Sequence, residues 1–221
     1  MIDFAAARRM MVDGQVRTAD VTDPRLLAAM LDLPREQFFP EEKASLAYLD
    51  LDVPVSEAGG PVRRLLKPMV LSKLIQAAGI AASDRVLDVG CATGYSTALL
   101  AGLAASVVGV EEDANLARRA AETLAAAGIS NARIVTGPLA LGFAPEGPYD
   151  LILLQGSAEI VPPALFDQIK DGGRLVCVLG RAPVGKAMLY RRIEGDLSGR
   201  PVFDAAAAPL PGFAKPQEFV F

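Results

Sequence analysis

The chain has 221 residues, 52% of them hydrophobic, with a formal net charge of −4 and a pI near 5.0. This composition suffices for a full hydrophobic core, and the acidic balance argues against a nucleic-acid binder, which normally carries a basic surplus. The sequence contains no histidine, which excludes Ser-His-Asp and Cys-His catalysis, histidine metal ligands and histidine general bases.

The amino terminus lacks a basic flank followed by an apolar run, so we expect no signal peptide. No uncharged stretch is long enough to span a bilayer, so we expect no membrane partner. The two cysteines, Cys91 and Cys177, are too few for a disulfide framework. We expect them to be reduced thiols in a cytoplasmic protein.

The first fifty-five residues predict an N-terminal helical subdomain, and 56–221 the core of the same single domain. Apolar residues recur at helical spacing over 3–16 and again after Thr22-Asp23-Pro24, a capping side chain followed by a first-turn proline. Pro34 should end that second helix. Shorter elements should follow: a helix over 41–48, an extended piece at 53–55 and a turn at 58–61.

From Pro68 onward the pattern predicts a helix capped by Gly79, and then strands that alternate with helices. The predicted strands are 85–89, 106–110, 132–136, 149–154 and 174–179; the helices are 95–103, 113–127 and 162–169, with a turn at 171–173. Such alternation predicts a doubly wound, mostly parallel α/β sheet. Two last strands, 188–193 and 202–208 around a turn at 195–199, should add an antiparallel edge and bring the total to seven.

The most informative segment is Val86-Leu87-Asp88-Val89-Gly90-Cys91-Ala92-Thr93-Gly94-Tyr95, an apolar strand that enters a glycine-rich turn before a helix. This is the opening of a nucleotide-binding α/β unit. A dinucleotide fingerprint would need glycine at positions 92 and 95, and the chain has Ala92 and Tyr95 there. Asp88 is unfavourable beside a pyrophosphate but favourable beside the amino group and sulfonium of S-adenosylmethionine (SAM). Glu111, which ends the next strand, should accept the ribose hydroxyls.

Further tracts share one family pattern. They include Arg9-Met10-Met11-Val12, Gln15-Val16, Asp23-Pro24-Arg25-Leu26-Leu27, Pro34-Arg35-Glu36-Gln37-Phe38-Phe39-Pro40 and Glu159-Ile160-Val161-Pro162-Pro163. With the glycine turn, they resemble the protein-L-isoaspartate O-methyltransferase family over nearly the whole chain. The tract Gly172-Gly173-Arg174-Leu175-Val176, like the glycine turn, resembles methyltransferases more generally. The family resemblance implies a Rossmann-like SAM methyltransferase fold and a protein-repair transferase. Such an enzyme methylates the free carboxylate of L-isoaspartyl residues in damaged proteins and releases S-adenosyl-L-homocysteine.

The predicted cofactor-binding residues are Asp88, Gly90, Cys91, Ala92, Thr93, Gly94, Tyr95, Glu111, Glu112, Gly137, Pro138, Leu139 and Gln155. The last four border the expected adenine and methyl-transfer site. No metal is expected, because the adjacent acids at 111–113 need not converge on one ion. No catalytic side chain is assigned either: an acceptor carboxylate is ionised at pH 7, so methyl transfer needs alignment rather than a general base.

The chain departs from the family pattern in three places. Leu66 replaces the serine of the family's Ile-Ser-x-Pro tract, which lies at the acceptor site. Gly137-Pro138-Leu139 replaces a Gly-Asp-Gly, and Gln155-Gly156-Ser157 replaces a run of small residues. Two alternatives therefore stay open: a methyltransferase of this fold with another acceptor, and a SAM-binding regulator without activity.

An anionic acceptor needs a cationic or donor-rich mouth to its site. Arg63, Arg64 and Lys67, which flank Leu66, are the candidates, and a guanidinium there could hold a carboxylate bidentately. The alternative interpretation of this tract is a solvated basic segment before a helix.

Overall fold

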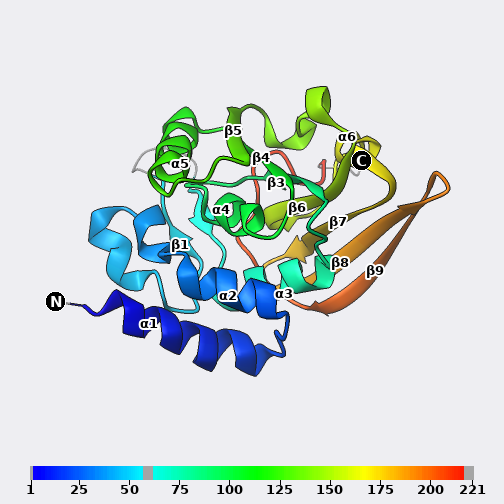
Figure 1. The fold of residues 1–221 in the computed structure, drawn as a ribbon. Coiled ribbons are helices and arrows are strands. Elements are labelled where there is room, and N and C mark those ends of the chain that lie inside the picture. Colours follow the sequence, from blue (N-terminus) through cyan, green and yellow to red (C-terminus); the bar gives the residue numbers. More distant parts are fainter. Residues whose placement is uncertain (1, 57–61, 217–221) are drawn as a thin grey trace, which may run out of the picture.

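The computed structural model describes residues 2–56 and 62–216 (Figure 1). Its centre is a seven-stranded sheet in the order β5-β4-β3-β6-β7-β8-β9. The strands are Arg85–Val89 (β3), Ser106–Glu111 (β4), Ala132–Thr136 (β5), Tyr149–Ala158 (β6), Ile169–Arg181 (β7), Val184–Ile193 (β8) and Asp196–Asp204 (β9). Strands β3 to β7 run parallel, and β8 and β9 are antiparallel to their neighbours. The predicted sheet is confirmed, including its antiparallel edge.

The two faces of the sheet are covered by different layers, because successive side chains of a strand point to opposite sides. Val86 and Leu153 face one cluster, while Leu87 and Ile152 face the other. The first cluster is covered by α3 (Pro68–Ala78), α4 (Tyr95–Ala101) and α5 (Ala114–Ala126), whose helical bounds come close to the predicted ones. The second is covered by α6 (Pro163–Asp167), the 3-10 turn Leu139–Leu141 and the segment after β9.

The N-terminal helices pack on the first of these faces (Figure 1). The helices are α1 (Phe4–Met11), continued by a π-helical turn at Val12–Val16, and α2 (Pro24–Asp32), with shorter 3-10 turns at Arg17–Ala19, Arg35–Phe38 and Glu41–Leu46. Asp23 caps α2 as predicted, its carboxylate accepting from the Arg25 amide at 2.9 Å. Met11, Leu26 and Met30 are fully buried in the cluster that also holds the sheet residue Val86. The helices and the sheet therefore share one core.

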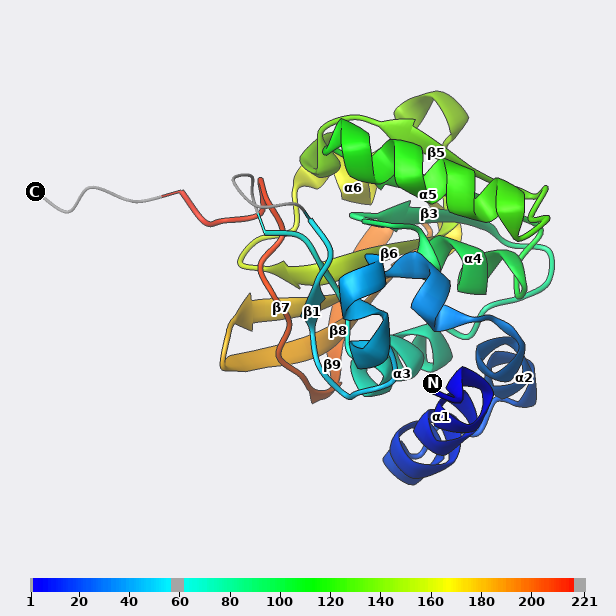
Figure 2. The same cartoon turned by 90° about the vertical axis from the view of Figure 1, so that its left-hand side faces the viewer.

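A two-stranded hairpin precedes α3 and delivers a side chain to the end of the large sheet. It pairs Val53–Pro54 (β1) with Arg64–Leu65 (β2), and the Val55 amide donates to the Arg63 carbonyl at 2.9 Å. The turn predicted at 58–61 lies outside the described residues. Figure 2 shows the chain after β9 returning past β7 toward this hairpin.

Two predicted turns are wrong. The 171–173 tract lies within β7, where Gly172 adopts φ 79° and the register against β6 shifts between Tyr149 and Leu151. The β8–β9 hairpin does not turn over 195–199 but at Glu194-Gly195, with φ values of 54° and 86°. A two-residue turn with both φ positive matches the twist of the flanking strands. Strands β8 and β9 can therefore extend up to this turn, through glycine, serine and aspartate residues that the sequence pattern assigned to a loop. Among the described residues, no helix is both long and apolar enough to cross a membrane.

Candidate active site

The glycine-rich turn links β3 to α4, with left-handed backbone at alternate positions. Gly90, Ala92 and Gly94 have φ values of 79°, 50° and 90°. For alanine this conformation costs roughly 1–2 kcal/mol, whereas glycine adopts it freely. A Cβ on Gly94 would lie 3.1 Å from the Ala120 Cβ. Gly94 thus lets α5 pack closely on the turn, a structural role that the sequence pattern did not indicate.

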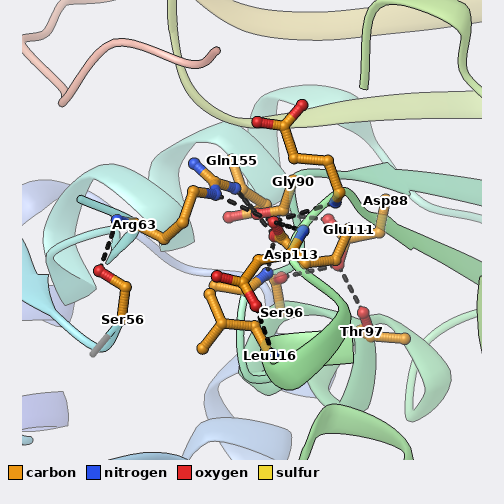
Figure 3. Close-up of polar contacts among 12 residues, drawn as sticks. Ser56, Arg63, Asp88, Gly90, Ser96, Thr97, Glu111, Asp113, Leu116 and Gln155 are labelled. Carbon is orange, nitrogen blue, oxygen red and sulfur yellow. Dashed lines mark hydrogen bonds and ion pairs between the residues drawn. The ribbon is translucent and has the colours of Figure 1, made fainter. Parts of the chain in front are cut away.

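Asp88 and Gln155 meet where the strand order reverses, between β3 and β6 (Figure 3). Asp88 is fully buried; its Oδ1 accepts from Gln155 Nε2 at 2.7 Å, and its Oδ2 accepts from the Ser96 and Thr97 hydroxyls at 2.6 and 2.7 Å. Burial raises the pKa of Asp88 to about 6, although the three hydrogen bonds oppose that rise. The sequence prediction missed Ser96 and Thr97; two adjacent hydroxyls in the first turn of the helix were the available signal.

The pKa of Asp88 makes the stability of the protein depend on pH. A carboxyl group with a pKa near 3.9 when unfolded and about 6 when folded adds stability below pH 4 that is lost as pH rises through 6. Asp88→Asn is nearly isosteric and does not titrate. We therefore expect the difference in free energy of unfolding, variant minus wild type, to rise by up to about 3 kcal/mol from pH 4 to pH 7. Urea titrations at pH 4.5, 5.5 and 7 measure this difference, and parallel pH curves for the two proteins would contradict it.

Glu111 ends β4 and has the most crowded carboxylate of the site (Figure 3). It is fully buried and accepts from the backbone N–H groups of Ala92, Glu112 and Asp113 at 2.8, 3.1 and 3.3 Å. Arg63 completes the set: its Nε lies 3.1 Å from Oε1 and its Nη2 lies 3.0 Å from Oε2. Arg63 Nη2 also donates to the Gly90 carbonyl at 2.8 Å. The predicted acceptor for ribose thus holds an arginine of the same chain.

The three basic candidates of the acceptor mouth lie in different places. The solvated interpretation is wrong for Arg63, which is 2% exposed and bound to Glu111. Arg64 is half-buried and donates to the Asp52 carbonyl at 2.9 Å, and Lys67 is half-buried at the start of α3. Leu66 packs in the large core cluster. A role in binding the acceptor stays a prediction for these residues.

Two leucines cover the glycine turn beside Arg63. A Cβ on Gly90 would lie 2.7 Å from Arg63 Nη2, 2.8 Å from Leu210 Cδ2 and 3.5 Å from Leu139 Cδ1. Leu139 follows β5 in the predicted adenine segment and is buried, whereas Pro138 before it is exposed. Leu210 belongs to the segment after β9. The cover over Gly90 therefore comes from three separate parts of the chain.

The remaining predicted cofactor residues surround this turn. Cys91, Thr93 and Tyr95 are fully buried, and the Thr93 and Tyr95 hydroxyls have no hydrogen-bond partner among the described residues. Burial, then the nearby Asp88 and Glu111, raises the pKa of the Cys91 thiol well above its usual range. Glu112 is exposed, and Gly137 donates its amide to the Glu111 carbonyl at 3.1 Å. The turn and the ends of β4 and β5 thus lie together.

A doubly wound sheet with a glycine turn after β3, an acid at the end of β4 and a switch point between β3 and β6 defines a Rossmann-like nucleotide-binding protein. Residues 7–210 match the family model described as protein-L-isoaspartate(D-aspartate) O-methyltransferase. The chain belongs to this family of SAM-dependent methyltransferases.

Relatives and solved structures agree with this assignment. A protein-L-isoaspartate O-methyltransferase from Methanoculleus marisnigri is 36% identical over 93% of this chain and 91% of its own length, and one from Koribacter versatilis is 35% identical over 95% and 92%. A solved protein-L-isoaspartate O-methyltransferase has the same fold, with a TM-score of 0.81 at 24% identity over 93% of this chain and 66% of the other. Another, from Plasmodium falciparum in complex with S-adenosyl-L-homocysteine, gives 0.76 at 18% identity over 94% and 98%.

Proposed function

We propose that the protein methylates the free carboxylate of L-isoaspartyl residues in damaged proteins, with SAM as the methyl donor, and that it works in the cytoplasm. Family membership over almost the whole chain supports the reaction. The observation that carries the cofactor is the buried carboxylate of Glu111 at the end of β4, where ribose hydroxyls are bound in this fold. The buried free thiols of Cys91 and Cys177 suit a reducing compartment.

The donor and acceptor set fits the adenosine part of SAM. Glu111 would accept the ribose hydroxyls in the positions that the Arg63 N–H groups fill in this structure. Gly90 offers a surface without a side chain, and the atoms nearest to the position of a Cβ there are the side-chain ends of Arg63 and Leu210. SAM supplies a methyl group bound to a sulfonium, and the sulfur leaves as a neutral thioether when the methyl group is transferred. Leu139 and Gln155 would border the adenine and the reacting end.

The chain's own contribution to methyl transfer is alignment and exclusion of water, since an ionised carboxylate is already a nucleophile. Asp88 holds Gln155, Ser96 and Thr97 in fixed positions around the switch point. Its three donors leave about one acceptor position, through which it would orient the amino group of SAM. No step requires a proton transfer by the protein, which agrees with a chain that has no histidine.

A matched pair of peptides tests the proposal. The protein is incubated with SAM and either an isoaspartyl peptide or its normal aspartyl isomer, and both are followed by mass. We expect a gain of one methyl group on the isoaspartyl peptide alone. No gain on either peptide, with SAM binding confirmed in the same sample, would refute the repair function. It would favour a different acceptor, which the buried Leu66 in place of the family's serine also supports.

Charge reversal at Arg64 tests the acceptor mouth. Arg64→Glu places an anion beside the expected site of an anionic acceptor, so we expect the KM for the isoaspartyl peptide to rise about tenfold or more with SAM affinity unchanged. Steady-state kinetics measure the first quantity and calorimetry the second. The matched control is Arg200→Glu on the exposed strand β9, which should leave both unchanged. Equal KM values for the two variants would remove Arg64 from the acceptor site.

A further inference from the structure

The ion pair between Arg63 and Glu111 is built into the fold rather than formed by chance at a surface. The side chains are 3% and 0% exposed, and the two guanidinium-to-carboxylate hydrogen bonds are bidentate. The β1–β2 hairpin fixes the Arg63 backbone, whose amide donates to Ser56 Oγ at 3.1 Å and whose carbonyl accepts from Val55. The arginine therefore reaches Glu111 from a fixed backbone.

The same carboxylate has no acceptor position left for another ligand. Three backbone N–H groups and two guanidinium N–H groups donate to it, which uses the roughly four lone-pair sites of a carboxylate. The backbone donors belong to the turn and to the strand end and stay in place. The Arg63 side chain is the donor that can move away. A pair of ribose hydroxyls can therefore bind Glu111 when Arg63 is displaced from it.

Leu210 closes the neighbouring space above Gly90 and Gly156. Its Cδ2 and Cγ lie 2.8 and 2.7 Å from the positions that a Cβ on those two glycines would take. The segment is bound to β6 by two backbone hydrogen bonds, from the Leu210 amide to the Ser157 carbonyl at 2.9 Å and from the Ser157 amide to the Ala208 carbonyl at 2.8 Å. The polar side chain of Arg63 and the apolar side chain of Leu210, from distant parts of the chain, thus both lie against Gly90.

We infer that Arg63 and Leu210 form an intramolecular plug, which competes with the cofactor for Glu111 and for the surface of Gly90. The inference rests on the proposed function, since it takes SAM to be the ligand of this site. The cofactor binds only the fraction of molecules in which the plug is displaced. Its apparent dissociation constant therefore exceeds the intrinsic one by the reciprocal of that fraction.

Calorimetric binding of S-adenosyl-L-homocysteine tests the plug without relying on catalysis. Arg63→Ala removes the competing guanidinium and leaves the three backbone donors of Glu111, so we expect it to bind at least tenfold more tightly than the wild type. The matched control is the adjacent Arg64→Ala, which among the described residues loses the hydrogen bond to the Asp52 carbonyl and should bind like the wild type. Circular dichroism confirms that each variant is folded.

Leu210→Ala tests the apolar half of the plug and replaces Arg63→Ala as the deciding variant if that protein does not fold. We expect it to bind the ligand several-fold more tightly than the wild type. Its control is Leu165→Ala, which opens a similar cavity in the same cluster at α6 and should not tighten binding.

The possible results separate the plug from the proposed function. If the wild type binds and the two plug variants bind no more tightly, the plug is refuted and the cofactor assignment stands. If neither the wild type nor any folded variant binds at millimolar ligand, both are refuted. If only the plug variants bind, the wild type is a closed form of the site, which is the strongest result in favour of the plug.

Discussion

Replacing Glu111 with alanine is expected to lower the free energy of unfolding by about 3–5 kcal/mol, because it leaves the Arg63 guanidinium buried without its carboxylate. Three backbone N–H groups, those of Ala92, Glu112 and Asp113, lose their acceptor in the same change. A buried donor without a partner costs about 1–3 kcal/mol, so these losses add to the effect of the uncompensated charge. Equilibrium unfolding in urea at pH 7 measures the sum.

Two further variants separate the ion pair from a general effect of substitution near the turn. Glu112→Ala changes the neighbouring exposed carboxylate and should stay within about 0.5 kcal/mol of the wild type. The double variant Arg63→Ala, Glu111→Ala removes both charges, so it should be more stable than Glu111→Ala alone, a coupling that a double-mutant cycle measures. A loss below about 1 kcal/mol in Glu111→Ala would show that the pair contributes little to stability.

The central strands could be predicted from the sequence because their signals are local. The β3 bounds agree with the predicted 85–89, and β4 extends only to Glu111 beyond the predicted 106–110, since short apolar runs between helical patterns describe buried parallel strands well. The same holds for Asp23 at the cap of α2 and for Gly79 after α3, where a single residue decides the helix end. The turn predicted over 195–199 was wrong, because the exposed edge strand β9 tolerates glycine, serine and aspartate, residues that usually indicate a loop.

The parts of the site that could not be predicted depend on contacts between distant segments. Arg63 and Glu111 are 48 positions apart, and nothing near Arg63 in the sequence indicates a buried partner. The basic tract looks solvated because charged side chains are rarely buried unless they are paired. Leu210 follows the last strand, where an apolar residue predicts burial but not the glycine that it covers. Such contacts follow from the sheet order and the hairpin, which bring these segments to one edge.

Arg174 illustrates a motif residue whose role is structural. It follows the glycine pair of the Gly172-Gly173-Arg174 tract that resembles other methyltransferases, yet it lies away from the glycine turn. Its guanidinium donates to the carbonyls of Ala78, Gly79 and Asp150 at 2.7, 2.9 and 3.0 Å, and to Asp84 Oδ2 at 2.5 Å. The side chains of Arg174 and Asp84 are 11% and 9% exposed. One side chain thus joins β7, β6 and the end of α3.

Arg174→Met keeps the length and apolar stem of the side chain but removes its donors. Within the described part of the chain, it leaves the nearly buried carboxylate of Asp84 with a single backbone donor, the Ala81 amide, and three carbonyls without their arginine partner. We expect a loss of about 3 kcal/mol in the free energy of unfolding, or roughly 6–12 °C in Tm for a chain of this size. The matched control is Arg191→Met, its exposed cross-strand neighbour on β8, which should change Tm little. Equal Tm values for the two variants would mean that the hydrogen bonds of Arg174 contribute little to stability. A large difference would explain why an arginine stands there without touching the reaction.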